Sequence, residues 1–222
     1  MSVLKDSGLE GLLTRLHDRS EEQEKNRNAP ERNRDGGRTH AGDAASVRTF
    51  MRDKMVALDR DKAAFCYQLC RANESRRIVE IGTSYGVSTL YLAAAVRDNW
   101  GKDGLVIGTE YEPGKAEAAR THFAEAGFAD VIELRDGDLR ETLRHLDGPV
   151  DFVLVDIWID MARPALELVA PHLRSGAIVV CDNTEKYRGE YADYFAFIND
   201  PANGFRTMTL PFKGGLEFSV RA

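Results

Sequence analysis

Short apolar runs alternate with helical patterns over most of the chain. Five runs rich in valine, isoleucine and leucine each span five or six residues. They are R-I-V-E-I (77–81), L-V-I-G-T-E (105–110), D-V-I-E-L-R (130–135), D-F-V-L-V-D (151–156) and A-I-V-V-C-D (177–182). Stretches with helical spacing lie between them, around 86–97, 113–127, 138–146 and 162–173. This alternation predicts an α/β fold, a mostly parallel sheet with helices on both faces.

The C-terminal end has a different pattern. Two runs, F-R-T-M-T-L (205–210) and L-E-F-S-V-R (216–221), are separated by P-F-K-G-G. A short connection that contains glycine is typical of a hairpin. One terminal strand is therefore expected to run antiparallel to the rest of the sheet.

The N-terminal part is expected to differ from this repeating pattern. Apolar residues at helical spacing predict an amphipathic helix over 3–17. Residues 18–43 have almost no large apolar side chains, which predicts a solvated, mobile arm. The alternative is a lid or a partner-binding segment. Helical spacing resumes from 44 to 72, so we divide the chain into an N-terminal helix and charged arm (1–46) and a main domain (47–222).

Composition places few limits on function. The chain has 222 residues, of which 43% are hydrophobic and 30% charged, and its net charge of −6 argues against a broad nucleic-acid surface. The three cysteines form no disulfide or zinc framework, and Cys66 and Cys70 are expected to be buried thiols. The start of the chain lacks a signal-peptide pattern and no apolar run is long enough to span a membrane, so a cytoplasmic protein is expected.

A glycine turn follows the first strand, in V-E-I-G-T-S-Y-G-V-S-T-L (79–90). Gly82 and Gly86 would let the backbone approach a ligand, but the G-x-x-x-G spacing lacks the geometry that holds a pyrophosphate. Glu80 would repel a phosphate and attract an ammonium group, directly or through water. Glu110 ends the second strand, where an acid would bind the hydroxyls of a ribose. The two acids predict S-adenosylmethionine as the ligand.

Further candidate contacts lie in the neighbouring turns. Asp138 follows the third strand and is expected to accept a hydrogen bond from the adenine amino group, although a helix N-cap is the alternative. The other residues expected to line the cofactor site are Thr83, Tyr85, Ser88, Tyr111, Gly137, Asp156 and Trp158.

Several motifs together resemble the small class I O-methyltransferases of the catechol and caffeoyl-coenzyme A type. They are V-E-I-G-T-S-Y-G-V-S-T-L-Y-L-A, G-T-E-Y-E-P-G-K, G-D-L, V-L-V-D-I-W, V-V-C-D-N and G-G-L-E-F-S-V-R, and the resemblance covers about residues 47–221. It implies a seven-stranded Rossmann-like sheet whose last strand is inserted antiparallel.

The resemblance also implies a divalent metal ion bound by Asp156, Asp182 and Asn183. The residues themselves agree with this, because oxygen ligands at the ends of adjacent parallel strands would converge and suit magnesium. A metal that chelates two vicinal oxygens would orient the acceptor and lower the pKa of its hydroxyl. The expected reaction is methylation of a hydroxyl on a catechol-like small molecule.

One position departs from the family pattern. Ile159 lies where catechol-type members carry the lysine that acts as general base, and isoleucine cannot take a proton. Either the metal acidifies the acceptor, or Lys186 or Asp160 substitutes, or the reaction is altered. Asp156 and Lys186 are the residues we assign to catalysis.

Two other functions remain open from the sequence. A cofactor-binding enzyme could methylate RNA or use S-adenosylmethionine without methylating. A protein that has lost its base could bind the cofactor without catalysis, although the three predicted metal ligands argue against this. A homodimer with a small-molecule substrate is expected, without nucleic acid or membrane partners.

Overall fold

The computed structural model describes residues 3–28 and 44–222. Seven strands form one sheet in the order β3-β2-β1-β4-β5-β7-β6. Their bounds are β1 Arg77–Ile81, β2 Leu105–Glu110, β3 Ile132–Asp136, β4 Val150–Val155, β5 Leu173–Asp182, β6 Phe205–Leu210 and β7 Leu216–Arg221. Strands β1 to β5 pair in parallel, while β7 is antiparallel to both β5 and β6. The mostly parallel sheet and its antiparallel hairpin, predicted from the sequence, are confirmed.

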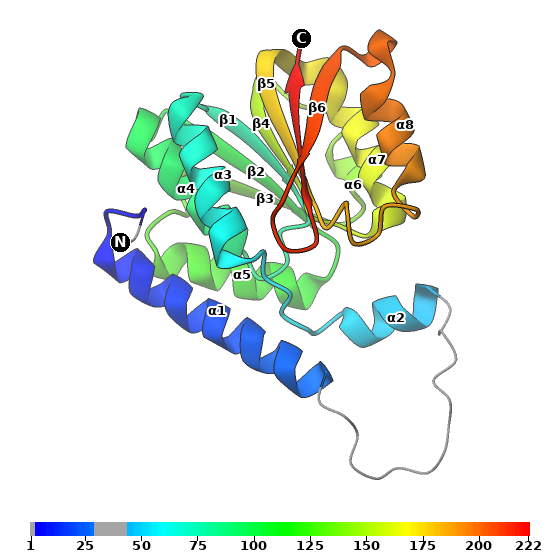
Figure 1. Cartoon of the computed structure of the whole chain (residues 1–222). Coiled ribbons are helices and arrows are strands. Elements are labelled where there is room, and N and C mark those ends of the chain that lie inside the picture. The colour runs from blue at the N-terminus through cyan, green and yellow to red at the C-terminus, as the bar shows by residue number, and fades with distance from the viewer. Residues whose placement is uncertain (1–2, 29–43) are drawn as a thin grey trace, which may run out of the picture.

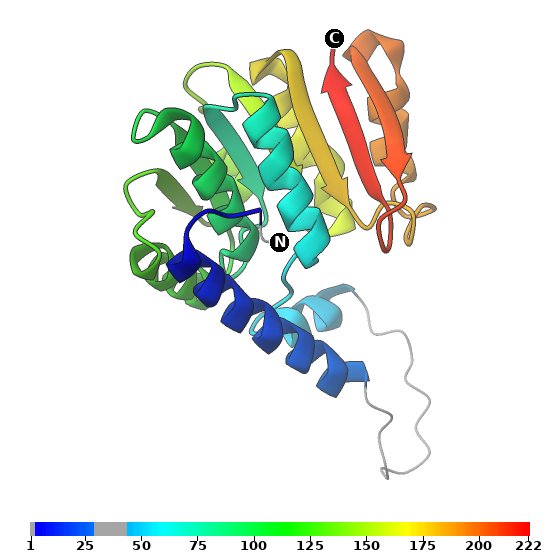
Figure 2. The ribbon, with the colours of Figure 1, turned by 60° about the vertical axis from the view of Figure 1, so that its left-hand side comes forward.

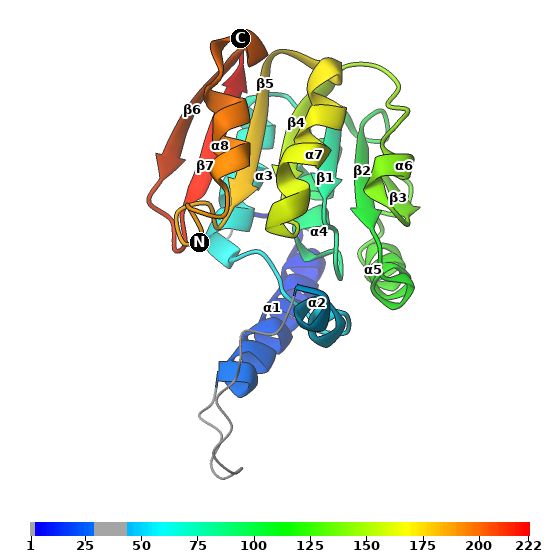
Figure 3. The same cartoon turned by 90° about the vertical axis from the view of Figure 1, so that its right-hand side faces the viewer.

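Helices cover both faces of the sheet (Figure 1; Figure 3). One face carries α3 Arg60–Ala72, α4 Val87–Trp100 and α5 Pro113–Glu125, and the other carries α6 Leu139–Thr142, α7 Ile159–Val169 and α8 Ala192–Asn199. The sequence pattern missed α8, and it predicted α6 too long. The central strands are buried on both faces, which explains why they read as continuous apolar runs.

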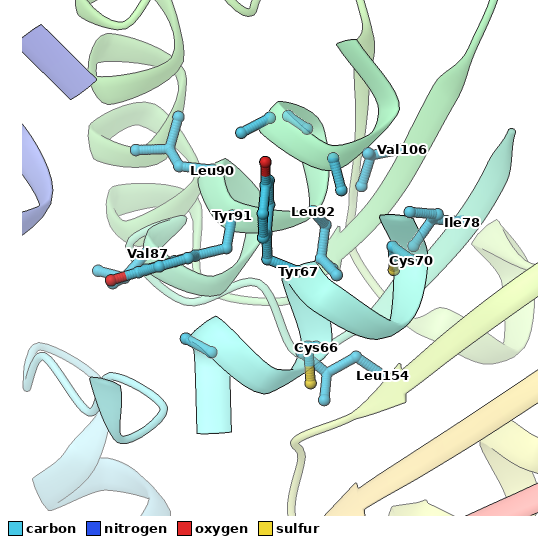
Figure 4. Close-up of a cluster of buried hydrophobic side chains, with 14 of the residues drawn as sticks. Cys66, Tyr67, Cys70, Ile78, Val87, Leu90, Tyr91, Leu92, Val106 and Leu154 are labelled. Carbon is cyan, nitrogen blue, oxygen red and sulfur yellow. The ribbon is translucent and has the colours of Figure 1, made fainter. Parts of the chain in front are cut away.

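Helix α3 packs its buried face against α4 and the sheet. Cys66 and Cys70 lie one helical turn apart on that face, among Ile78, Leu92 and Leu154 (Figure 4). Both thiols are free and burial raises their pKa values. The prediction of buried thiols is therefore confirmed for both cysteines.

The N-terminal region is more ordered than the sequence indicated. Helix α1 spans Ser7–Asn28, so residues 18–28 of the predicted mobile arm are helical, and residues 29–43 of that arm lie outside the described part of the chain. Two polar side chains explain why the helix extends to Asn28. The Ser20 hydroxyl accepts a hydrogen bond from the Ala57 N–H at 3.0 Å, and the Gln23 side chain accepts one from the Met55 N–H at 3.0 Å.

Helix α1 also belongs to the main core. Leu9, Leu12, Leu13 and Leu16 are buried in the same apolar cluster as α3 and α4 (Figure 2). The expected helical stretch at 44–72 is two helices, α2 Ala44–Met51 and α3, joined by a segment at 52–59. Among the described residues, no helix is both long and apolar enough to cross a membrane.

Candidate functional site

The carboxyl ends of the parallel strands gather the predicted site residues at one edge of the sheet. The turn after β1 is shaped by Gly82 and Gly86, whose φ angles are +97° and +82°. A Cβ on Gly82 would lie 2.0 Å from the Asp156 carbonyl oxygen, and one on Gly86 would lie 2.4 Å from the Phe123 ring. Both positions therefore require glycine, for the local conformation and for close packing.

Glu80 lies beneath this turn and is fully buried. Its carboxylate accepts hydrogen bonds from the hydroxyls of Ser88 at 2.6 Å, Thr83 at 2.9 Å and Thr89. Burial raises the pKa of Glu80, and the three hydroxyl donors oppose that rise. The structure thus gives Glu80, Thr83 and Ser88 a role in holding the turn; a direct contact between these side chains and a cofactor remains a prediction.

Glu110 joins the turns after β1 and β2. Its carboxylate accepts hydrogen bonds from the backbone N–H groups of Ser84 at 2.7 Å and Glu112 at 2.8 Å. Each carboxylate oxygen can accept a second hydrogen bond, so capacity for a ligand's hydroxyls remains. The geometry is compatible with the ribose-binding role predicted for Glu110.

Ser84 is a candidate contact that sequence reasoning missed. Its φ of +50° is unusual for a residue other than glycine. Its hydroxyl is buried at the turn and has no hydrogen-bond partner among the described residues. A ligand at the turn could satisfy this hydroxyl, which is the kind of group that buried sites rarely leave unpaired.

The turn after β3 supplies Gly137 and Asp138. Gly137 donates its N–H to the Glu110 carbonyl at 2.8 Å, which connects the two turns. Asp138 is the N-cap of α6 and accepts a hydrogen bond from the Arg140 N–H at 2.9 Å. Hydrogen bonds from the Arg140 guanidinium lower the pKa of Asp138 to about 2. The cap that the sequence left as an alternative is observed, and the adenine contact remains a prediction.

Helix α2 lies across the carboxyl ends of the strands (Figure 3). Arg48 donates to the Asp160 carboxylate at 2.6 Å and lies 5.6 Å from the centre of the Trp158 ring. On the other side, the Tyr85 hydroxyl donates to the Asp53 carbonyl at 2.9 Å. These contacts join α2 and the segment after it to both sides of the glycine turn.

A pocket lies between this segment and the turn. It is lined by Met55, Val56, Ala57, Gly82, Thr83, Ser84, Tyr85, Val87, Ser88 and Asp156. Trp158 and Tyr111, two further predicted contacts, are exposed near the strand ends, by 40% and 71%. The structure therefore brings most of the predicted cofactor residues to one edge of the sheet, and Met55, Val56 and Ala57 line the pocket beside the glycine turn.

The second group of acids lies at the ends of β4 and β5. Asp182 is buried, and its carboxylate accepts a hydrogen bond from the Lys62 ammonium at 2.6 Å. The other Asp182 oxygen accepts one from the Asn183 side-chain amide at 2.8 Å. The ammonium of Lys62 also lies 3.4 Å from the Asp59 carboxylate. Asp156 ends β4 nearby, and burial followed by the charge of Asp182 raises its pKa well above the usual range.

Lys62 comes from the first turn of α3 and is only 1% exposed. Burial is the largest single influence and opposes its charge, but the Asp182 and Asp59 carboxylates together outweigh burial and hold the pKa of Lys62 above its ordinary value. The sequence contained a signal that could have found it. Lys62, Cys66 and Cys70 follow one another at intervals of four, so the face predicted to bury the cysteines also buries this lysine.

The arrangement does not fit the metal ion that the resemblance implies. The oxygen donors are of the right type, but each oxygen of Asp182 already accepts one hydrogen bond, and the donor to one of them is the Lys62 ammonium, which places a positive charge beside the carboxylate. The side-chain amide oxygen of Asn183 lies close to Gly214. A Cβ added to Gly214 would be 2.5 Å from that oxygen. Among the described residues, no group of three or more Asp, Glu, His or Cys side chains could hold a metal ion. The prediction of magnesium therefore finds no support in this geometry.

The proposed substitutes for the missing lysine lie elsewhere. Lys186 is exposed and its ammonium lies 4.8 Å from the centre of the Tyr187 ring. Asp160 pairs with Arg48, and Ile159 packs against the apolar cluster of α7 and the sheet. These contacts do not bring Lys186 to the strand ends, so its catalytic role remains a prediction without structural support.

Comparisons with known proteins relate the chain to methyltransferases. Residues 79–184 match a family described as a methyltransferase domain. The chain is 34% identical over 139 residues to a catechol O-methyltransferase from Mycobacterium tuberculosis, covering 62% of this chain and 61% of that relative. It is 32% identical to a putative O-methyltransferase from Mycolicibacterium smegmatis, over 60% of this chain and 69% of the relative. This chain thus spans less than two thirds of the catechol O-methyltransferase.

The fold has solved counterparts. An O-methyltransferase from Bacillus cereus, solved in complex with SAH, superposes with a TM-score of 0.70. The alignment covers 99% of this chain and 93% of the other, at 21% sequence identity. At that identity the likeness concerns the fold, a Rossmann-like methyltransferase sheet.

Proposed function

Because this chain belongs to the S-adenosylmethionine-dependent O-methyltransferase family, we propose that it transfers the methyl group of S-adenosylmethionine to a hydroxyl of a small molecule. The observation that carries the proposal is the turn after β1, where the Ser84 N–H donates to Glu110 and the Ser84 hydroxyl has no hydrogen-bond partner in the described part of the chain. The fold alone would be too general a basis, because similar sheets host many activities.

The cofactor site is proposed at the ends of β1, β2 and β3. Glu110 binds the ribose hydroxyls, and Asp138 lies at the turn where the adenine amino group would donate. Gly82 gives the amino-acid tail close access to the backbone, with no pyrophosphate cradle to favour a dinucleotide. The Bacillus cereus neighbour, which carries SAH on the same fold, supports this choice of ligand.

The chemistry needs a positioned acceptor and a destination for its proton. When bound, the sulfonium supplies an electrophilic methyl group: the acceptor oxygen forms a bond to the methyl carbon as the carbon–sulfur bond breaks, and sulfur keeps the electron pair. Asp156 is the proposed acceptor of the hydroxyl proton, because it ends β4 and lines the pocket beside the glycine turn. Residues 44–57 would exclude water from this reaction.

The proposed acceptor is a catechol-like molecule. The name of the mycobacterial relative supports this class, and the partly exposed Trp158 ring offers an aromatic surface near the strand ends. The proposed transfer does not depend on a divalent cation, because Asp182, one of the side chains predicted to bind one, already pairs with the Lys62 ammonium and the Asn183 amide.

The test separates binding from transfer. Calorimetry should detect S-adenosylhomocysteine binding in the wild type, and Glu110→Ala should weaken it by about a hundredfold, because two charge-assisted hydrogen bonds are lost. Glu112→Ala, which removes an acid two residues away, is the matched control and should bind normally. Equal affinity in wild type and Glu110→Ala would remove the cofactor assignment.

Transfer itself is measured with methyl-labelled cofactor and catechol. Label should appear on a catechol oxygen with the wild type and not with Glu110→Ala at low cofactor concentration. Normal cofactor binding without transfer to any hydroxyl acceptor would instead favour a different use of the cofactor, as the loss of the usual lysine at Ile159 allows.

A further inference from the structure

A lysine ammonium lies beside the acids at the ends of β4 and β5. Lys62 approaches Asp182 at 2.6 Å and Asp59 at 3.4 Å, and its side chain is 1% exposed. A lysine is rarely buried to this degree unless carboxylates compensate the loss of hydration. The ammonium is therefore a fixed part of this acid cluster.

The position of Lys62 is costly for the helix that carries it. It lies in the first turn of α3, where the helix dipole is positive and disfavours a cation. Asp59 precedes the helix and makes no side-chain cap hydrogen bond to it, so its carboxylate is free to face the ammonium. The sequence D-R-D-K thus places a cation at the helix start and turns it toward the strand ends.

The same contacts restrict what else can bind there. A divalent ion at Asp182 would have to share one carboxylate oxygen with the Lys62 ammonium and the other with the Asn183 amide, each of which already donates a hydrogen bond to it. It would also lie within a few ångströms of a positive charge that has no route to solvent, where repulsion is poorly screened. Asp156 adds a second carboxylate, and Lys62 lowers its pKa against the effects of burial and Asp182.

We propose that the ammonium of Lys62 takes the place of a divalent metal ion in this protein. It neutralises Asp182 and fixes the ends of β4 and β5, so the strand-end acids Asp156 and Asp182 form a site that requires no metal. Lys62 is a positioning residue in this assignment, since its burial keeps it from solvent. Its role in catalysis rests on the proposed methyl transfer, whereas its competition with metal does not.

Metal binding tests the competition directly. Mn²⁺ is the probe, followed by electron paramagnetic resonance of the free ion and by calorimetry. The wild type should bind Mn²⁺ only weakly, and Lys62→Met should bind it about tenfold more tightly or better, because the repelling charge is gone while both carboxylates remain. Lys102→Met removes an exposed lysine at 78% exposure and is the matched control that should leave Mn²⁺ affinity unchanged.

A second variant covers the case in which Lys62→Met does not fold. Lys62→Met with Asp182→Asn removes both partners of the buried pair, so no uncompensated charge is left inside. This double variant should melt closer to the wild type than Lys62→Met does, and it should not gain Mn²⁺ affinity. The coupling of the two substitutions in melting temperature measures the pair itself.

The outcomes separate this proposal from the proposed function. Tight, stoichiometric Mn²⁺ binding by the wild type, or methyl transfer that stops with EDTA and returns with Mg²⁺, would overturn the assignment of Lys62. Equal Mn²⁺ affinity in wild type and Lys62→Met would overturn it as well. Weak wild-type binding that tightens in Lys62→Met, in a protein that methylates nothing, would refute the methyl transfer and leave the assignment standing.

Discussion

Two halves of one sheet edge hold their acids in opposite ways. At the ends of β1 and β2, Glu80 and Glu110 accept hydrogen bonds from neutral donors, which are hydroxyls and backbone N–H groups. At the ends of β4 and β5, Asp182 accepts one from an ammonium. Neutral donors stabilise a carboxylate without cancelling its charge, while an ammonium removes the net charge.

This difference assigns separate roles to the two halves. The β1/β2 half remains negative, so it can attract a ligand that carries a sulfonium and an ammonium group. Lys62 already neutralises part of the negative charge of the β4/β5 half. We therefore expect this half to fix the geometry of the acceptor side of the site. Under the role proposed for Lys62, the second half requires a divalent ion only when Lys62 is absent.

The largest effect is expected from a change that forces the two halves apart. Gly82 directly follows β1 in the first half. A Cβ on Gly82 would lie 2.0 Å from the Asp156 carbonyl oxygen, which belongs to the second half. Its φ of +97° is also strained for any other residue. Gly82→Ala should therefore lose about 3 kcal/mol or more of unfolding free energy, as overpacking and strain add up. Chemical denaturation and S-adenosylhomocysteine calorimetry measure both losses.

Gly114→Ala is the matched control. Gly114 lies in the first turn of α5, and nothing lies within 4 Å of an added Cβ. The same substitution there should change stability by less than about 1 kcal/mol. Near-equal stability of the two variants would mean that the close contact between the halves carries no strain.

The sequence predicts the first half better than the second. The glycines, Glu80 and Glu110 lie within or beside strands, where alternation of apolar runs fixes both the element and its end. Local spacing was therefore enough to place the turn and its acids on one edge. The same reasoning placed Asp156, Asp182 and Asn183 together, since they also end adjacent strands.

Partners that come from distant elements were not predicted. Lys62 reaches Asp182 from a helix 120 residues earlier in the chain, and no strand pattern indicates which helix covers which strand end. Likewise, the role of Glu80 depends on hydroxyls whose rotamers only packing selects. The helical extension of α1 to Asn28 was missed because polar residues there bond to 55–57. The homodimer expected from the sequence remains a prediction.

An intermediate effect is expected from Glu80→Gln, which tests whether the charge of the first half is used. The amide keeps the size of the side chain, its oxygen can accept from Thr83 and Thr89, and its NH2 group can donate to the Ser88 hydroxyl, so stability at neutral pH should change by less than about 1 kcal/mol. Affinity for S-adenosylhomocysteine should fall about tenfold, because the negative charge beneath the ligand's ammonium is lost. Glu80→Ala, which removes the acceptor for three hydroxyls, is the variant expected to lose stability.

The pH dependence of Glu80→Gln gives a second readout. Burial raises the pKa of Glu80 above its ordinary 4.5, so protonated Glu80 is more favoured in the folded than in the unfolded protein. Wild-type stability from this group is therefore fully present below about pH 4.5 and decreases as pH rises through the raised pKa. The Gln variant should lack this decrease. Glu80→Gln could leave both the affinity for S-adenosylhomocysteine and the pH dependence of stability unchanged. That result would show that ionisation of Glu80 does not destabilise the fold and that the side chain only holds the turn.

The smallest effect on stability and cofactor binding is expected from substitutions of Asp138, which follows β3. Its carboxylate caps α6 and pairs with Arg140, and asparagine is an equally good cap. Asp138→Asn should therefore leave the melting temperature almost unchanged and weaken S-adenosylhomocysteine binding by only about two- to threefold, since its oxygen still accepts. Asp138→Ala should weaken binding by about tenfold, because the acceptor for the adenine amino group is lost. Asp136→Ala, which removes the exposed acid two residues earlier, is the control and should bind normally. If Asp138→Ala also binds S-adenosylhomocysteine normally, Asp138 acts only as a helix cap. Glu110 is then the last acid along the chain that contacts the cofactor.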